Sequence, residues 1–121
     1  MPEKVEKLLI IDDEPYAEKM QAVFSRRGIR ALWKETGLDG VSAYSEFEPD
    51  AVLLDFHLPD ITGIEVFKML KEHDPDVRVY FISASPSPEV QQEAKKLGGQ
   101  GFFMKPVNLL SVINILIPTE K

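Results

Sequence analysis

The sequence predicts an α/β fold in which a parallel sheet of five strands is covered by helices on both faces. Five short runs of apolar residues occur along the chain, and such runs are typical of parallel strands buried on both faces. Segments with apolar residues at helical spacing separate these runs, and strands that alternate with helices form parallel sheets. A length of 121 residues suits one domain, which we expect to occupy residues 1–121.

The first two strand–helix units are marked by apolar runs and by residues that start or stop helices. Residues 7–11 predict the first strand, and Pro15 then opens a helix because proline fits the first helical turn. Apolar positions at helical spacing continue until Gly28, which ends this helix. A weaker apolar run predicts a strand at 29–34, and a short helix is expected at 39–48. The inward positions of that helix are Val41, Tyr44 and Phe47.

The rest of the chain repeats the pattern three times. Proline, aspartate and glycine between residues 56 and 63 predict a loop before the third helix, and a turn at 85–88 supplies an N-cap for the fourth. The last helix is expected from about Val107 to Ile117. The remaining strands are predicted at 51–55, 77–82 and 101–104. The inward positions of the third and fourth helices are Ile64, Phe67 and Leu70, then Val90, Ala94 and Leu97.

The composition excludes several classes of function. A formal charge of −6 argues against direct binding to nucleic acid or to an anionic membrane. The chain has no cysteine, which excludes disulfides and thiolate metal sites and is typical of a reducing compartment. The first residues lack the apolar stretch of a signal peptide, and the longest apolar segment, 107–117, is too short to span a bilayer. We therefore expect a cytoplasmic protein without membrane insertion.

Polar residues follow four of the five apolar runs. Asp12 and Asp13 follow the first run, Asp55 ends the third, Ser83 follows the fourth and Lys105 follows the fifth. Because the carboxyl ends of parallel strands meet at one edge of a sheet, these side chains should converge. A lone aspartate after a strand is more often a helix cap or a turn residue, but that reading would have to hold at all five positions.

Three carboxylates at one edge repel one another, by roughly 4 kcal/mol per pair at 4 Å and an effective dielectric near 20. A protein keeps such a cluster to bind a cation or to hold a proton. Oxygen ligands favour a hard cation, and Mg²⁺ fits best because it accepts a few carboxylates and keeps positions for water and phosphate oxygens. A lysine and a hydroxyl beside them suit a phosphoryl group, so the set predicts phosphoryl transfer onto a carboxylate.

Four segments, in this order and spacing, resemble the receiver domain of two-component response regulators, in particular the single-domain, chemotaxis-regulator-like members. The resemblance covers the whole chain and implies a doubly wound, flavodoxin-like three-layer sandwich with strand order 2-1-3-4-5. It also implies a phosphorylatable signalling switch rather than an enzyme. The segments are Asp12-Asp13-Glu14-Pro15, residues 53–63, Ser83-Ala84-Ser85 and Phe103-Met104-Lys105-Pro106.

The resemblance implies a role for each residue at this edge. Asp55 would accept the phosphoryl group from a phosphohistidine on a sensor histidine kinase or a histidine phosphotransfer protein. Lys105, often followed by a cis proline bond in the family, would pair with that group. Ser83 and Phe102 would be the switch residues, Ser83 moving toward the phosphoryl group and Phe102 rotating inward. The expected ligands of Mg²⁺ are Asp12, Asp13, Asp55 and the backbone carbonyl of His57.

Two positions depart from the pattern of many members. Phe102 stands where a tyrosine is frequent, so any switching by this residue has to work through packing alone. His57 follows the expected phosphoacceptor by two positions. Its side chain is either an exposed loop residue or lies over the phosphoryl group and controls the access of water.

Other functions fit the residues less well. A magnesium-dependent phosphatase with an aspartyl nucleophile of the haloacid dehalogenase-like type needs an Asp-x-Asp pattern and a cap domain, whereas Asp12 and Asp13 are adjacent. A flavodoxin-like redox module needs a phosphate-binding loop after the first strand, where these carboxylates would repel phosphate. A receiver-like scaffold that is not phosphorylated would not need the full set of residues.

The last helix predicts a docking surface. It carries no charged residue, whereas a solvated face normally does. Scattered exposed apolar residues are ordinary, but we expect this helix, with strand 101–104 and the helix before it, to dock a downstream protein or a second copy of the chain. The inward stripe is Leu109, Val112, Ile113 and Leu116, and the positions outside it are Leu110, Ile115 and Ile117.

Overall fold

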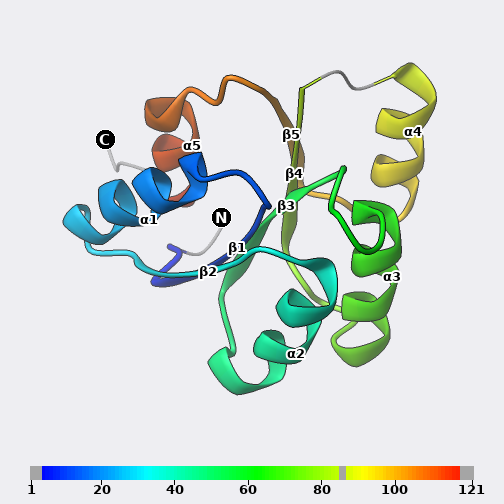
Figure 1. Ribbon diagram of the computed structural model, residues 1–121, viewed down its shortest axis with the longest axis horizontal. Helices are drawn as coiled ribbons and strands as arrows, with labels where there is room; N and C mark the ends of the chain where they lie inside the picture. The colour runs from blue at the N-terminus through cyan, green and yellow to red at the C-terminus, as the bar shows by residue number, and fades with distance from the viewer. Residues whose placement is uncertain (1–3, 85–86, 118–121) are drawn as a thin grey trace.

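Five strands and five helices alternate along the chain in the computed structural model, which describes residues 4–84 and 87–117 (Figure 1). The strands are β1 (Lys7–Ile11), β2 (Arg30–Lys34), β3 (Ala51–Asp55), β4 (Val79–Ser83) and β5 (Gly101–Met104). The helices are α1 (Tyr16–Arg26), α2 (Gly37–Phe47), α3 (Gly63–His73), α4 (Pro88–Lys96) and α5 (Leu109–Leu116). None of these helices is long and apolar enough to cross a membrane.

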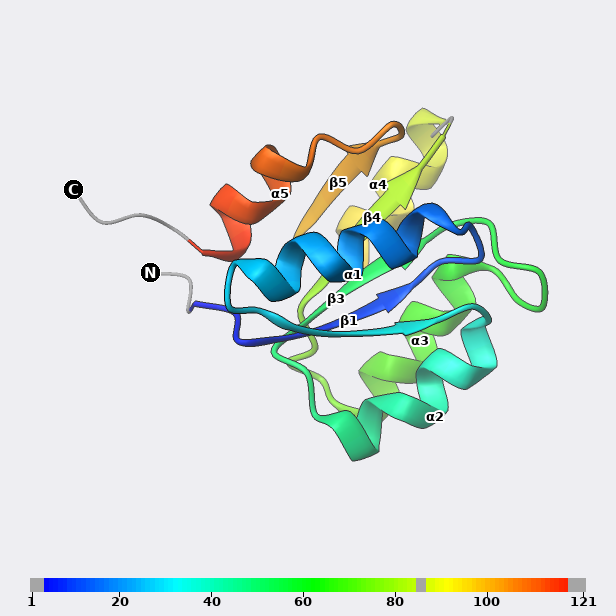
Figure 2. The same cartoon turned by 60° about the vertical axis from the view of Figure 1, so that its left-hand side comes forward.

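The strands form one parallel sheet in the order β2-β1-β3-β4-β5, which confirms the predicted fold class and strand order. Helices α1 and α5 cover one face, and α2, α3 and α4 cover the other (Figures 1 and 2). Three strands, β1, β3 and β4, lie in the middle and are almost completely buried. The edge strands β2 and β5 are partly exposed, which explains the weaker apolar signal of β2.

Each face of the sheet has its own apolar core, because successive side chains of a strand point to opposite faces. In β1, Leu8 and Ile10 join the core beneath α1 and α5, whereas Leu9 and Ile11 join the core beneath the other three helices. All four are fully buried, and burying a side chain of this size contributes about 1.5–3 kcal/mol. The continuous apolar runs of the sequence are therefore explained by two-sided burial.

Short polar side chains start four of the helices, as N-cap residues do. Thr36 accepts the N–H of Asp39 at the start of α2, and Ser87 accepts that of Val90 at the start of α4. The other two caps are Thr62 for α3, which forms a capping box with Glu65, and Asn108 for α5. The expected cap in the turn 85–88 is thus Ser87, while Ser85 and Pro86 lie outside the described residues.

Several predicted boundaries were displaced by one or two residues. Helix α2 begins at Gly37 rather than 39 because Thr36 is its cap, and α5 is shorter than 107–117 because Asn108 caps it. Strand β4 covers 79–83 rather than 77–82, since its ladder with β3 begins at the Val52–Val79 pair.

One predicted side-chain direction was wrong. We expected Ile117 to lie outside the inward stripe of α5, but it packs against the core beneath α1 and α5. Its backbone has left the helical region (φ −125°, ψ 81°), so helical spacing no longer decides its direction. Leu110 and Ile115 do lie outward and are 59% and 41% exposed.

Candidate functional site

The polar residues that follow the strands meet at one edge of the sheet. Asp55 is the last residue of β3 and Ser83 the last of β4, while Asp12 follows β1 and Lys105 follows β5. Asp12, Asp55 and Ser83 are nearly inaccessible, at 1%, 3% and 1% exposure. They are the buried polar and charged residues of the described chain, and all three lie at this edge of the sheet.

Three carboxylates gather there. One oxygen each from Asp12, Asp13 and Asp55 lies within 4.8 Å of the other two, with Asp13 on the exposed side. Backbone donors orient the two buried members: the N–H of Glu14 donates to Asp12 Oδ1 at 3.0 Å, and the N–H of His57 donates to Asp55 Oδ1 at 3.1 Å. Each donor satisfies one oxygen and leaves the rest of its carboxylate available to the centre of the cluster.

Within the described part of the chain, the ammonium group of Lys105 reaches into this cluster. Lys105 Nζ lies 3.0 Å from Asp55 Oδ2 and 3.4 Å from Asp12 Oδ2, and it also lies 2.6 Å from Glu14 Oε1 at the rim. The backbone of Lys105 is held as well, since its N–H donates to the carbonyl of Ser83 at 2.8 Å. The bond from Lys105 to Pro106 is cis, as the resemblance implied.

The electrostatics of the cluster follow from burial and from charge crowding. Burial raises the pKa of Asp12 to about 6; the N–H of Glu14 opposes this change, and the charge of Asp55 adds to it. Burial would lower the pKa of Lys105, but its hydrogen bonds to Glu14 and Asp55 outweigh that effect and raise the pKa above its ordinary value. Lys105 is therefore a cation at neutral pH, whereas the ionised form of Asp12 is disfavoured by its burial and by the charge of Asp55.

This arrangement suits a hard divalent cation. The donors are carboxylate oxygens from three residues, they converge within the reach of one ion, and one of them faces solvent. A net excess of negative charge remains after Lys105 is counted, since three carboxylates and Glu14 face one ammonium. The donor set therefore fits Mg²⁺, which keeps coordination positions for water and phosphate oxygens.

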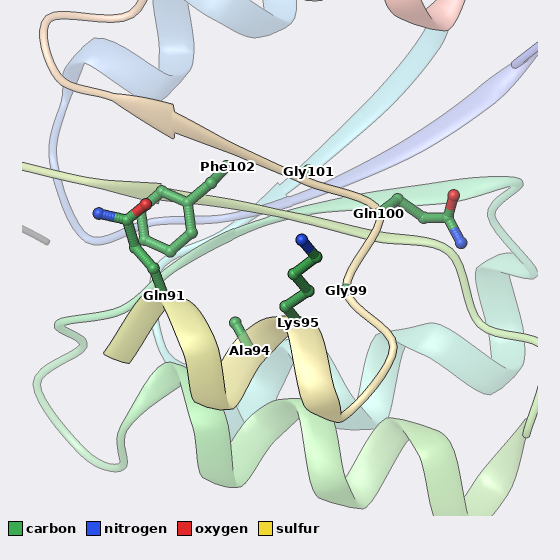
Figure 3. A pocket seen from close by; sticks show the side chains of 7 residues that line it. All are labelled: Gln91, Ala94, Lys95, Gly99, Gln100, Gly101 and Phe102. Atoms are coloured by element: carbon green, nitrogen blue, oxygen red, sulfur yellow. The ribbon is translucent and has the colours of Figure 1, made fainter. Parts of the chain in front are cut away.

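The expected switch residue Phe102 lies on the β5 edge beside α4. Its ring packs against Phe56, with centroids 5.1 Å apart, and against Phe81, at 6.1 Å. It also lines a pocket of about 220 Å³ with Gln91 and Lys95 of α4 (Figure 3). Because Phe56 directly follows Asp55, this aromatic cluster connects the edge of the sheet to the β5–α4 surface.

The side chain of His57 is exposed, and both readings of its role stay predictions. It lines a groove of about 550 Å³ whose walls include Ser83 and Val90. The backbone of His57 pairs with Thr62 in an isolated antiparallel bridge, which folds the loop after β3 back on itself. The role of the His57 carbonyl as a metal ligand stays a prediction.

The loop after β3 is held close to Asp55 by a glycine. A Cβ atom at Gly63 would lie 2.5 Å from the carbonyl oxygen of Asp55 and 2.8 Å from the Cα of Phe56. Any larger residue would therefore push α3 away from the acidic cluster. The same loop is tied to α2, because both carboxylate oxygens of Asp60 accept backbone N–H groups at the start of that helix, at 2.8 Å each.

Three contributors to this region were missed by sequence reasoning. Glu14 contacts Lys105, the indole N–H of Trp33 donates to the carbonyl of Asp12 at 2.7 Å, and Asp60 holds the start of α2. Glu14 was detectable in principle, since it directly follows the two aspartates. Nothing in the sequence around Trp33 or Asp60 indicates these contacts, which join segments more than 20 residues apart.

Comparison with known proteins gives one family match and two similar proteins. The sequence model of the response regulator receiver domain matches residues 8–116. Sporulation initiation phosphotransferase F of Bacillus subtilis is 34% identical over 106 residues, which cover 86% of this chain and 85% of that protein. The regulatory protein LuxO of Vibrio cholerae is 42% identical over 71 residues, which cover 59% of this chain but only 16% of that protein.

A solved structure of similar fold is the CheX–CheY–BeF₃–Mg²⁺ complex of Borrelia burgdorferi. The TM-score is 0.83 at 25% sequence identity, and the match covers 89% of this chain and 84% of that chain.

Proposed function

Because this chain belongs to the response regulator receiver domain family, whose members are phosphorylatable aspartate switches, we propose that Asp55 is the residue that accepts the phosphoryl group. One observation carries this assignment. Asp55 is the buried carboxylate nearest to the Lys105 ammonium, with its Oδ2 at 3.0 Å against 3.4 Å for Asp12 Oδ2, and its Oδ1 is held by the N–H of His57. The oxygen on the lysine side is therefore positioned to attack a phosphorus atom whose oxygens Lys105 can hold.

The donor is a phosphohistidine on a sensor histidine kinase or a histidine phosphotransfer protein. Asp55 Oδ2 forms the new O–P bond as the N–P bond of the phosphohistidine breaks, and the electron pair of that bond remains on the imidazole nitrogen. Lys105 balances the charge on the phosphoryl oxygens through charge-assisted hydrogen bonds. Such bonds are among the strongest contacts that a protein offers. Ser83, at the end of the neighbouring strand β4, supplies a hydroxyl to the same group.

Asp12, Asp13, Asp55 and the backbone carbonyl of His57 are the proposed ligands of Mg²⁺. When bound, such an ion would neutralise negative charge on the carboxylates and on the phosphoryl group. The N–H of Glu14 holds Asp12 in the orientation that turns its Oδ2 toward the cluster. The exposed position of Asp13 gives the site a path to solvent, through which water and the phosphodonor enter.

The signal leaves the site through the aromatic cluster. A phosphoryl group on Asp55 draws Ser83 toward it, and Phe102 then changes its packing against Phe56 and Phe81. The affected surface is formed by α4, β5 and α5, where Met104 and Leu110 are 62% and 59% exposed. This surface docks a downstream protein or a second copy of the chain, and the protein acts through it as a regulator rather than as an enzyme.

Phosphorylation of Asp55 is tested by incubating the protein with acetyl phosphate and Mg²⁺ and measuring the intact mass. The parent should gain the mass of one phosphoryl group, and Asp55→Asn should gain none. Asp39→Asn, which changes an exposed aspartate at the start of α2, is the matched control and should react like the parent. A full mass gain in Asp55→Asn would refute the assignment of the acceptor.

A further inference from the structure

The ammonium of Lys105 lies between two kinds of carboxylate. On its inner side are Asp55 and Asp12, at 3.0 and 3.4 Å, which belong to the proposed metal site. On its outer side is Glu14, at 2.6 Å, the shortest of the three contacts. The side chain of Glu14 is 55% exposed and lies outside the group of carboxylates that converge for a metal.

A divalent cation and the ammonium compete for the same inner oxygens. Like charges a few ångströms apart in a partly buried site repel one another strongly, so a doubly charged ion beside the ammonium is strongly disfavoured. Binding of the ion therefore requires the ammonium to give up part of its contact with Asp12 and Asp55. The ease of that movement depends on whether another carboxylate nearby can accept hydrogen bonds from the ammonium.

Glu14 offers such a place. Its backbone is fixed to the same turn as the cluster, because its N–H donates to Asp12 Oδ1. Its carboxylate already accepts a hydrogen bond from the ammonium, so Lys105 needs only a small shift outward. Without this carboxylate the ammonium would be shared between Asp12 and Asp55 alone and would block the oxygens that a metal needs.

We propose that Glu14 is a positioning residue that holds the Lys105 ammonium at the rim of the site, so that the three aspartates are free to bind a divalent cation. This inference rests on the proposed magnesium-dependent function and adds to it a residue outside the set of metal ligands and phosphoryl-contacting groups. It acts through Lys105 and not by touching the ion.

The experiment measures the dissociation constant for Mg²⁺ by calorimetry on the full chain. Glu14→Gln removes the charge, and Glu14→Asp keeps the charge but is one methylene group too short for the contact. Both should weaken Mg²⁺ binding by about threefold to fivefold, which is the size that a partly exposed ion pair supports. The control Glu18→Gln removes a nearby exposed charge from α1 and should bind like the parent.

A double-mutant cycle with Lys105→Ala separates positioning from a simple effect of charge. In that background, Glu14→Gln should leave the dissociation constant unchanged within twofold, because there is no ammonium left to hold. An equal weakening with and without Lys105 would overturn the inference, as would Glu14→Asp or Glu14→Gln binding Mg²⁺ like the parent. Metal-free melting temperatures show whether each variant is folded.

Failure of this inference can be told apart from failure of the proposed cofactor. If the parent binds Mg²⁺ and the Glu14 variants do not differ from it, only the positioning role is refuted. If the parent itself shows no binding of Mg²⁺ at millimolar concentration, the proposed metal site is refuted and the role of Glu14 with it.

Discussion

At the residue scale, Asp12 carries an electrostatic cost. Its carboxylate is 1% exposed, burial raises its pKa to about 6, and Asp55 is a close like charge. At neutral pH the residue is therefore ionised against the preference of its surroundings. Lys105 offsets part of that cost from 3.4 Å. Such a group is expected where function rather than stability selects the residue.

Asp12→Asn should raise the stability of the metal-free protein at neutral pH by about 1 kcal/mol, because it removes a buried charge and keeps the oxygen that accepts the Glu14 N–H. The same change should abolish the stabilisation by Mg²⁺, which for the parent is roughly 2.7 kcal/mol at a hundredfold excess over the dissociation constant. Urea unfolding with chelator and with Mg²⁺ measures both effects. Asp13→Asn is the control: it should also weaken Mg²⁺ binding but gain less stability, since Asp13 is exposed. A metal-free Asp12→Asn protein less stable than the parent would contradict this reading.

At the scale of elements, the loop after β3 is joined to α2 by one side chain. Both oxygens of Asp60 accept backbone N–H groups, from Gly37 and Leu38, at the start of that helix. A carboxylate at a helix N-terminus satisfies unpaired donors and interacts favourably with the helix dipole. The slight burial of Asp60 opposes ionisation, but the N–H groups of Leu38 and Gly37 outweigh it and lower its pKa below the ordinary value of an aspartate. The loop that follows Asp55 is therefore anchored to the start of α2 through Asp60.

Asp60→Ala should lower the free energy of unfolding by about 1 kcal/mol at neutral pH, the usual cost of losing a helix cap. A lowered carboxyl pKa means that the stabilisation is present above the unfolded-state value and is lost as the pH falls through the folded-state value. The difference between Asp60→Ala and the parent should therefore be constant near neutrality and shrink as the pH falls below the ordinary pKa of an aspartate. Asp39→Ala, in the first turn of the same helix, controls for loss of charge alone. An equal loss of stability in both variants would mean that the hydrogen bonds of Asp60 contribute nothing.

At the scale of the whole molecule, the two faces of the sheet are closed but one outer surface stays apolar. Helix α5 buries Val112, Ile113 and Leu116 against the sheet and still presents Leu110 and Ile115 to solvent. A helix without charged residues that keeps apolar side chains exposed is what a docking partner of the phosphorylated form would need.

Leu110→Glu and Ile115→Glu should each weaken capture of the partner or self-association of the phosphorylated protein by at least about tenfold, because a buried charge would replace an apolar contact. Neither should lower the melting temperature much, since both side chains are outward. The control Leu38→Glu changes a leucine of α2 that is 50% exposed on the other face of the sheet. Sedimentation and pull-down before and after phosphorylation measure the effect. Binding that survives both α5 substitutions would move the docking surface elsewhere.

The order of the elements and the edge at which the polar residues meet were determined by the sequence alone. Two-sided burial leaves continuous apolar runs, and a parallel sheet sends the residue after each run to the same edge. Asp12, Asp55, Ser83 and Lys105 could therefore be placed together without coordinates. Caps displaced the boundaries of α2 and α5, because a cap depends on local hydrogen bonds that an apolar pattern does not register.

Only the tertiary structure decided which atoms touch. Three contacts depend on side-chain reach between segments far apart in the chain. Lys105 contacts Glu14 as well as Asp55, Trp33 donates to the carbonyl of Asp12, and Asp60 holds the start of α2. The direction of Ile117 was decided in the same way, by a backbone that leaves the helix one residue early. Within a helix or strand, the periodicity of apolar residues specifies the face to which a residue belongs. Contacts at the ends of helices and strands are set by packing in three dimensions.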